Sequence, residues 1–163
     1  MISYFRVDER VVHGQTTVHL SKQYPLDGIL IVDDDIANDP FMMNIYKNVI
    51  PNDKVRVLGF TVEKAVTKLS EAEKSAKSYY VVCKRPTTVK RLMEAGYEIK
   101  NPVNLGPQGV RPGTVSFEVM LNLLPEEIEA LDYAEAHGVK VISNPRLFTP
   151  NLTWKEASKG YKR

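Results

Sequence analysis

The sequence predicts an α/β fold with three layers, in which helices cover both faces of a mostly parallel, doubly wound sheet of about six or seven strands. Short apolar runs alternate with segments of helical periodicity, and the connections between them are short. Some runs, such as Ile29–Val32, are apolar throughout, as a strand covered on both faces would be. The length of 163 residues suits one compact core, so residues 1–163 are expected to form a single domain.

Strands are expected where short runs of β-branched, aromatic and aliphatic residues occur between turn signals. The last such run is expected to be the final strand of the domain. In chain order the expected strands are Ile2–Val7, Ile29–Val32, Val55–Leu58, Tyr79–Cys83, Val103–Leu105, Thr114–Phe117 and Val139–Ile142.

Segments of helical periodicity fill the gaps between these strands. Asn38-Asp39-Pro40 places a cap before a proline at the first helical position. Pro125–His137 has acidic residues in its first turn and a glycine after its end. The expected helices are Gly14–Tyr24, Pro40–Val49, a segment that Thr61 caps and that reaches Ser75, Thr87–Ala95, Pro125–His137 and a short helix near Trp154–Ser158.

Composition argues against several classes of function. The formal net charge of +2, with basic residues scattered along the chain, does not favour nucleic-acid binding. No apolar stretch approaches the roughly 20 residues that cross a bilayer, and the N-terminus lacks a secretory pattern. Any role at a membrane is therefore expected to be peripheral. The single cysteine, Cys83, excludes an internal disulfide and is expected to be a buried hydrophobe in a reducing compartment.

The loop after the first strand is the expected ligand site, because ligands in this fold class bind beyond the carboxyl ends of the strands. His13 lies where this loop meets a helix. The first N–H groups of a helix lack partners and its dipole is positive there, so a phosphate group binds readily. Arg10 supplies a forked, permanent positive charge for phosphate oxygens. Gly14 has no Cβ and lets an anion approach the backbone.

These residues alone leave two interpretations open. A neutral histidine can act as a nucleophile, so His13 could accept a phosphoryl group. Alternatively, His13 is a structural residue that caps the helix while arginines pair with Asp8 and Glu9. Asp8 could orient the imidazole or anchor Arg10 or Arg6, and spacing does not decide among these roles.

A longer motif carries a resemblance to a known family. Arg6-Val-Asp-Glu-Arg-Val-Val-His-Gly-Gln15 closely resembles the Arg-Ile-Asp-x-Arg-Leu-Ile-His-Gly-Gln signature of the IIB component of the mannose–fructose–sorbose class of the bacterial sugar phosphotransferase system. Val32-Asp-Asp-Asp-Ile-Ala-Asn-Asp39 is similar to the family's Val-x-Asp-x-x-Ala-Asn-Asp. Asn104-Leu-Gly106 and the later Arg111-Pro-Gly113 resemble its Asn-Val-Gly segment and the basic glycine turn that follows. The resemblance runs over nearly the whole chain.

The resemblance implies a relay of phosphoryl transfer. His13 would accept the group, with Nδ1 favoured, from a IIA donor protein and pass it to a sugar taken up by the membrane IIC and IID permease subunits. Arg10 would stabilise the group, helped by the loop backbone through Gly14 and Gln15. Asp8 and Arg6 would not touch the phosphoryl group themselves, but would hold Arg10 and His13 in position. The protein would be cytoplasmic, associated through the permease with the inner face of the membrane, and would need no cofactor.

The chain departs from the family pattern in two places. The family often has a tryptophan soon after His-Gly-Gln, where this chain has His19-Leu20. Gly106-Pro-Gln-Gly-Val-Arg111 also lacks the family's usual Gly-Met-His sequence. Both differences could alter the docking surface or the choice among mannose, fructose, sorbose, N-acetylglucosamine and N-acetylgalactosamine. The sugar and the oligomeric state, including a homo-oligomer, stay open.

An acidic cluster suggests a rival function. Asp33-Asp-Asp35 follows an apolar strand, as in response-regulator receiver domains that bind magnesium. A receiver also needs an aspartate at the end of its third strand, yet the strands ending near Leu58 and Cys83 are followed by Gly59-Phe60 and Lys84-Arg85. Asp34 is therefore expected to be a wall of the active-site cleft.

The sequence also offers further candidate site residues and other classes of function. Lys84 and Arg111 are candidate cleft residues, Lys84 because it follows a strand directly. No cysteine or histidine stands at metal-ligand spacing from His13 or His19, so no metal site is expected. A dinucleotide enzyme would need a glycine-rich turn after the first strand, and Asp8–His13 contains no glycine. A purely protein-binding module without phosphotransfer is the remaining alternative.

Overall fold

The computed structural model describes residues 1–148 and 150–163. In these residues a sheet of seven strands forms in the order β3-β2-β4-β1-β5-β8-β9. All neighbouring strands are parallel except β9, which runs antiparallel to β8. The strands are β1 (Ile2–Val7), β2 (Gly28–Val32), β3 (Arg56–Phe60), β4 (Tyr79–Cys83), β5 (Val103–Leu105), β8 (Val141–Ser143) and β9 (Leu152–Thr153). The predicted mostly parallel α/β sheet is thus confirmed.

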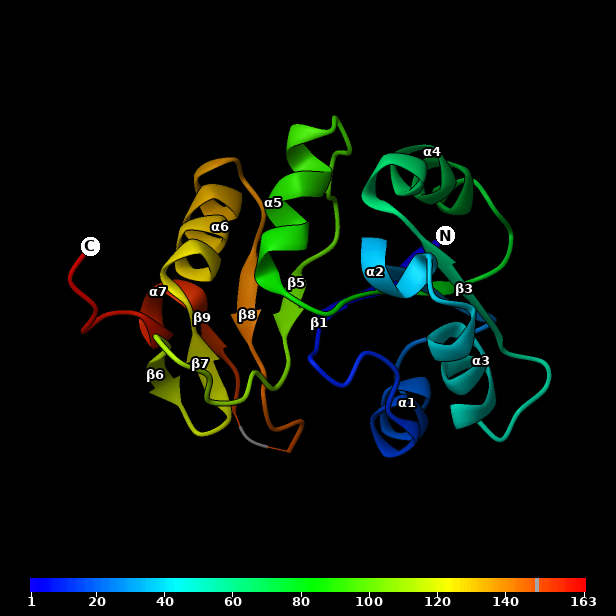
Figure 1. Cartoon of the computed structure of the whole chain (residues 1–163), viewed down its shortest axis with the longest axis horizontal. Coiled ribbons are helices and arrows are strands. Elements are labelled where there is room, and N and C mark those ends of the chain that lie inside the picture. Colours follow the sequence, from blue (N-terminus) through cyan, green and yellow to red (C-terminus); the bar gives the residue numbers. More distant parts are fainter. Residues whose placement is uncertain (149) are drawn as a thin grey trace.

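Helices cover both faces of the sheet, as expected for a doubly wound fold. Figure 1 shows α4, α5 and α6 along one side of the sheet and α1 and α3 along the other. The helices are α1 (Gly14–Ser21), α2 (Asp34–Ala37), α3 (Pro40–Val49), α4 (Val62–Glu73), α5 (Pro86–Glu94), α6 (Pro125–Ala136) and α7 (Trp154–Ala157).

The two faces of the sheet bury two separate apolar clusters. Alternate residues of a strand point to opposite faces, so Val81 packs among residues of α4, α5 and α6, whereas Val82 packs with residues of α1 and α3. All five residues of β2 are buried. This explains why β2 reads as a continuous apolar run rather than an alternating one.

Some predicted boundaries were wrong. α1 ends at Ser21 rather than Tyr24, because Pro25 has no N–H to donate and cannot continue a helix. The N–H groups of Gln23 and Tyr24 both donate to the carbonyl of Leu20 and form a turn there. The short helix α2 was missed; the carboxylate of Asp33 caps it by accepting from the N–H of Ile36 at 2.9 Å.

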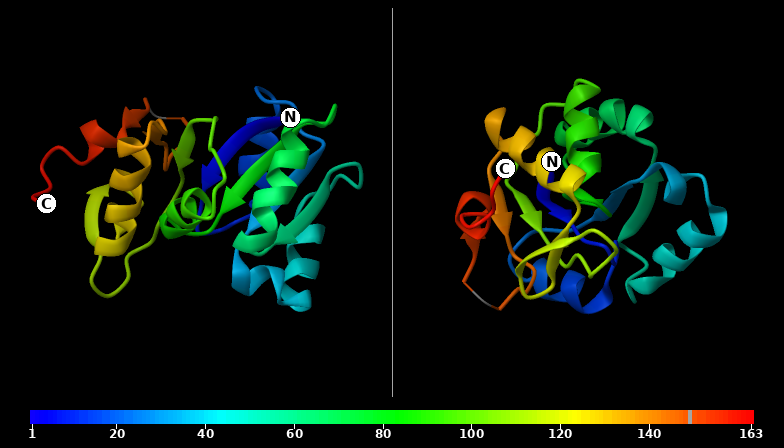
Figure 2. Two further views of the ribbon diagram at one scale, coloured as in Figure 1. Left: turned by 90° about the horizontal axis from the view of Figure 1, so that it is seen from above. Right: turned by 60° about the vertical axis from the view of Figure 1, so that its left-hand side comes forward.

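The C-terminal third also differs from expectation. Val139–Ile142 was expected to be the final strand, but β8 begins at Val141 and β9 follows it. The run Thr114–Phe117 corresponds to β6 (Val115–Glu118), which pairs with an unpredicted β7 (Leu121–Leu123) in a separate two-stranded sheet. β7 is three residues long and lies directly between a turn and α6, so its periodicity does not distinguish it from the connection. In Figure 2 this hairpin and the C-terminus lie at the end of the molecule opposite α3.

The order of the strands defines where a ligand can bind. β1 and β4 are neighbours, yet β1 connects through α1 to β2 and β4 connects through α5 to β5, in opposite directions across the sheet. A crevice opens beyond the carboxyl ends of strands at such a switch point. The loops that flank it comprise residues 8–13 and 84–85.

Candidate functional site

The loop after β1 is held in one tight conformation. The N–H of Asp8 donates to the carbonyl of Cys83 at 2.9 Å, which ties the loop to β4. The N–H of Val11 donates to the carbonyl of Asp8 at 2.9 Å, and the N–H of Arg10 donates to Asp8 Oδ1 at 2.9 Å. Val11 has a φ of 61°, a region that a β-branched residue adopts only when its surroundings hold it there.

Asp8 is the centre of a buried ion cluster. Its Oδ2 accepts from Arg6 Nε at 3.1 Å and from Arg10 Nη2 at 2.9 Å, and its Oδ1 accepts from Arg10 Nε at 3.1 Å. Burial raises the pKa of the Asp8 carboxyl, but hydrogen bonds from Arg10 and the charge of Arg6 outweigh it and hold the pKa below its usual 3.8. Two guanidinium groups against one carboxylate leave a net positive charge under the loop.

The three members of this cluster differ in their access to solvent. The side chains of Arg6 and Asp8 are 3% and 2% exposed, whereas that of Arg10 is 33% exposed. Only Arg10 can therefore present its guanidinium to a ligand. Arg6 and Asp8 lie beneath it. Of the roles considered for Asp8, the structure shows the anchoring of both arginines.

His13 takes the N-cap position of α1, but its side chain makes no cap hydrogen bond within the described part of the chain. Its Nδ1 instead lies 3.3 Å from Thr16 Oγ1, which in turn accepts from Arg10 Nη2 at 3.2 Å. The side chain of His13 therefore does not cap the helix, whereas the pairing of arginines with Asp8 and Glu9 that this interpretation also expected is present. The imidazole is half-buried and joined to Arg10 through one hydroxyl.

A groove of about 1020 Å³ opens beside His13, between α1 and residues 145–148. Among the described residues that line it, every titratable side chain is basic. Exposed apolar side chains share its walls, among them Val18, Met120 and Phe148 at 50%, 44% and 84% exposure. The lining residues are Arg10, His13, Gly14, Gln15, Thr16, Val18, His19, Lys22, Met120, Pro145, Arg146, Leu147 and Phe148.

Two further predicted site residues, Gly14 and Gln15, lie on the wall of this groove. Gln15 is exposed. A Cβ built at Gly14 would find Val49 O at 3.6 Å, an ordinary contact. Among the described atoms, the space around Gly14 does not itself require glycine.

Asp34 lies elsewhere. It belongs to a separate hollow of about 650 Å³ with Thr61 and Glu63, and its Oδ2 accepts from Arg91 Nη2 at 2.5 Å. The hydrogen bond from Arg91, with one from the N–H of Val62, holds the pKa of Asp34 below its usual value. The acidic cluster after β2 is thus engaged in an ion pair and a helix cap, and Asp34 is not a wall of the groove beside His13.

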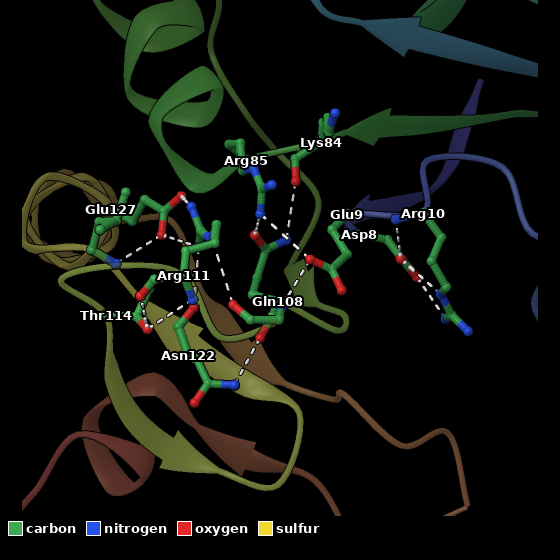
Figure 3. Close-up of polar contacts among 12 residues, drawn as sticks. Asp8, Glu9, Arg10, Lys84, Arg85, Gln108, Arg111, Thr114, Asn122 and Glu127 are labelled. Carbon is green, nitrogen blue, oxygen red and sulfur yellow. Dashed lines mark hydrogen bonds and ion pairs between the residues drawn. The ribbon is translucent and has the colours of Figure 1, made fainter.

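Arg111 is also engaged elsewhere, in an ion pair with Glu127. Its Nη1 and Nη2 donate to Glu127 Oε1 and Oε2 at 2.9 and 2.8 Å, and Nη2 reaches the carbonyl of Asn122 at 3.2 Å. Figure 3 shows the Arg111 guanidinium turned toward Glu127 on the left, with Arg10 on the right. Arg111 does not line the groove that His13 lines.

The second loop at the switch point is joined to the first through Arg85 and Glu9. The fully buried amide of Gln108 holds the second loop in place, because it accepts from Arg85 Nη1 at 2.7 Å and donates to the carbonyl of Lys84 at 3.0 Å. Arg85 lies 3.6 Å from Glu9, whose carboxylate also accepts from the N–H of Gly109 at 2.8 Å (Figure 3). Lys84 thus contributes its backbone to this junction and is not among the groove residues.

Sequence reasoning missed Thr16 and the segment 145–148. Thr16 is three residues beyond His13, a spacing that places the two side chains on one face of a helix, so helical periodicity could have found it. Residues 145–148 lie more than 130 positions away in an irregular segment, and nothing local in the sequence places them near His13.

Residues 1–148 and 150–163 show neither a metal-binding cluster nor a helix suited to a membrane. No group of three or more His, Cys, Asp or Glu side chains there is arranged to hold a metal ion. None of the helices in the described ranges combines the length and apolar character needed to span a bilayer.

Comparison with known sequences identifies one family. The sequence model of the family described as "PTS system sorbose subfamily IIB component" matches residues 2–145. The sorbose-specific EIIB component of Klebsiella pneumoniae is 28% identical over 141 residues, covering 86% of this chain and 84% of that protein. The N-acetylgalactosamine-specific IIB component 1 of Escherichia coli (strain K12) is 26% identical over 136 residues, covering 83% and 85%.

Two crystal structures share the whole fold. The IIBSor domain of the sorbose permease from Klebsiella pneumoniae superposes with a TM-score of 0.87 at 25% identity, covering 99% of this chain and 98% of that domain. The manxB protein of Thermoanaerobacter tengcongensis superposes with a TM-score of 0.87 at 26% identity, covering 99% and 96%.

Proposed function

Because the chain belongs to the sorbose subfamily of IIB components of the sugar phosphotransferase system, we propose that it is a phosphocarrier whose His13 takes a phosphoryl group from a IIA protein and passes it to a sugar. Membership of this family makes the protein a sugar-specific component of a phosphotransferase system. The residue, the donor and the route to the sugar are the proposal.

The observation that carries the proposal is the position of His13. It stands at the start of α1, beside the switch point between β1 and β4, and is linked through Thr16 to the partly exposed guanidinium of Arg10. A helix start and an arginine together form a site that favours the oxygens of a phosphoryl group. The half-buried imidazole is in reach of a partner protein.

Transfer between two histidines requires little covalent work from the protein. The N–P bond of the donor breaks as a bond from phosphorus to Nδ1 of His13 forms, and charge spreads over three equatorial oxygens. Donors already held in place stabilise this charge without reorganising. Arg10 is held by Asp8 Oδ1 and Oδ2 at 3.1 and 2.9 Å, which aligns the guanidinium before any ligand arrives.

The groove beside His13 supports docking of a protein donor. Its titratable lining residues are basic and several of its apolar side chains are exposed, a combination suited to an acidic, partly apolar surface. A mannose-specific relative from Escherichia coli (strain K12), 26% identical, is named an EIIAB component, and this chain spans 49% of it. We assign the second contact, at the inner face of the membrane, to the IIC and IID permease subunits.

The proposed acceptor is a hexose or N-acetylhexosamine that offers a primary hydroxyl. The names of the relatives include sorbose, mannose, fructose and N-acetylgalactosamine, at 25–28% identity. The sugar hydroxyl would attack phosphorus from the side opposite Nδ1, forming a P–O bond as the P–Nδ1 bond breaks. The hydroxyl proton would pass to the released imidazole or to water, so the histidine is free again after each cycle.

The test is phosphorylation from radiolabelled phosphoenolpyruvate through the general donor proteins and a IIA protein. We expect label that is acid-labile and base-stable, and we expect His13→Ala to lose it completely. His137→Ala is the matched control, because His137 is exposed at the end of α6, where its ring stacks on Tyr133 and its Nδ1 lies 2.8 Å from the Tyr133 carbonyl. Full labelling of His13→Ala, or label stable to acid, contradicts the proposal.

A further inference from the structure

We infer that Thr16 is a positioning residue for phosphoryl transfer, which directs the lone pair of His13 Nδ1 toward the phosphoryl group. The inference rests on the proposed phosphorylation of His13. It starts from a chain of three groups, in which Arg10 Nη2 lies 3.2 Å from Thr16 Oγ1 and Thr16 Oγ1 lies 3.3 Å from His13 Nδ1. Thr16 is 8% exposed, so water competes little for its hydroxyl.

The direction of this chain follows from the chemistry of its first member. A guanidinium only donates hydrogen bonds, so the oxygen of Thr16 must be the acceptor from Arg10. A hydroxyl has a single proton and two acceptor lone pairs, so after accepting from Arg10 the Thr16 hydroxyl can still donate its proton to Nδ1. In the proposed arrangement it does so, and Nδ1 is then unprotonated, with the ring proton of neutral His13 on Nε2. The nitrogen beside Arg10 is therefore the one with a free electron pair.

The neighbouring threonine shows what Thr16 would otherwise do. In helices, threonine hydroxyls commonly donate to a carbonyl four residues earlier. Thr17 follows this pattern and donates to the carbonyl of His13 at 3.0 Å. The two residues are consecutive, β-branched and buried, at 8% and 7% exposure. Only Thr16 is directed at the imidazole.

This arrangement serves the transfer step without moving a proton to or from Nδ1. As the donor's N–P bond breaks and the Nδ1–P bond forms, the hydroxyl of Thr16 leaves Nδ1 and donates to an oxygen of the arriving group. Arg10, already bonded to Thr16, reaches the same group from the side. Thr16 thus orients the ring before transfer and aligns it with Arg10.

The test compares Thr16→Val, which removes the hydroxyl and keeps the β-branched shape, with Thr16→Ser, which keeps the hydroxyl. Thr17→Val is the matched control in the same turn, and Thr16→Ala replaces Thr16→Val if that variant does not fold. Two measurements are made: the rate and half-saturation of phosphorylation by phospho-IIA, and the ¹⁵N resonances of the His13 ring in the unphosphorylated protein.

We expect Thr16→Val to lower the maximal rate by about two- to tenfold, the loss carried by one hydrogen bond of ordinary strength, with half-saturation by phospho-IIA unchanged. Thr16→Ser should restore the rate. In the neutral ring, Nδ1 should resonate as an unprotonated nitrogen in the wild type and Thr16→Ser, and move toward the average of the two tautomers in Thr16→Val. Thr17→Val should change neither the maximal rate nor the Nδ1 resonance.

Two results would overturn the inference: a wild-type rate in Thr16→Val, or an Nδ1 resonance that does not change. Either can occur while His13→Ala still abolishes labelling, in which case only the role of Thr16 fails. If His13 carries no label at all, the proposed function fails, and the ¹⁵N resonances still decide whether Thr16 donates to Nδ1.

Discussion

At the scale of single residues, Asp8 joins the two arginines of the site to its loop. One carboxylate binds two arginines and the N–H of Arg10, so it both neutralises charge and shapes the loop. Arg6 is almost completely buried, and its Nη2 has no hydrogen-bond partner within the described chain. A buried guanidinium is tolerated only with a counter-charge beside it.

We predict that Asp8→Asn lowers the free energy of unfolding by about 3 kcal/mol at neutral pH, because it leaves Arg6 buried without a counter-charge. The folded-state pKa of Asp8 lies below its ordinary 3.8, so its stabilisation is complete above that pH and is lost as pH falls through the folded-state pKa. Urea unfolding at several pH values from neutral to below the usual pKa measures this.

The control is Asp53→Asn, which removes an exposed carboxylate from the turn before β3. It should leave the urea midpoint nearly unchanged at every pH. Equal midpoints for Asp8→Asn and the wild type at neutral pH would show that the ion cluster does not stabilise the fold.

At the scale of elements, the first turn of α6 joins the β6–β7 hairpin region to the helix layer. Glu127 Oε2 accepts from the N–H of Leu124 at 2.8 Å, which caps the helix, and both its oxygens bind Arg111. The Glu127 side chain is 3% exposed. Arg111, suggested by the sequence as a cleft residue, thus fastens its loop to α6 (Figure 3).

We predict that Glu127→Gln lowers the free energy of unfolding by about 2 kcal/mol, since it weakens a charged, bidentate pair and the helix cap together. The rate of phosphoryl transfer per folded molecule should stay at the wild-type value, because this pair does not line the groove beside His13. Urea unfolding and the labelling assay measure the two quantities.

Glu129→Gln on the same helix is the matched control. The Glu129 side chain is 69% exposed and pairs with Lys90 at the surface, so the urea midpoint should hardly change. A large loss of transfer rate in folded Glu127→Gln would return Arg111 to the list of functional residues.

At the scale of the whole molecule, the C-terminal segment completes the core. Trp154 at the start of α7 is fully buried, its Nε1 donates to Asp132 Oδ1 at 2.8 Å, and its ring lies 5.0 Å from that of Phe117. Arg163 also pairs with Asp132, at 2.7 Å. The segment therefore contacts α6 and the β6–β7 hairpin as part of the main core.

We predict that the chain unfolds as one domain in a single transition. Trp154 is the sole tryptophan, so its fluorescence reports the C-terminal segment, whereas far-ultraviolet circular dichroism reports all the helices. The two urea curves should coincide. A fluorescence transition at clearly lower urea would mean that the segment unfolds separately. Trp154→Phe, which lacks the fluorophore, provides the background signal.

The sequence by itself determined the fold class and the long elements. These elements have local signals: the apolar run of β2, the proline and cap before α3, and the acidic first turn of α6. Such signals are sufficient to predict elements of five or more residues. The sequence also predicts the loop before Gly14 as the site, because a helix start and an arginine have the same chemistry wherever they stand in a fold.

Only the tertiary structure decided which distant residues meet at that loop. Periodicity describes neighbours along the chain, whereas contacts between segments depend on strand order, and a sheet brings residue 8 to residue 83 and residues 145–148 to α1. For the same reason Arg111 and Asp34, plausible partners of His13 by type, were assigned by the fold to Glu127 and Arg91. Ion pairs form with whichever opposite charge the fold places within reach, and distance in space is absent from the sequence pattern.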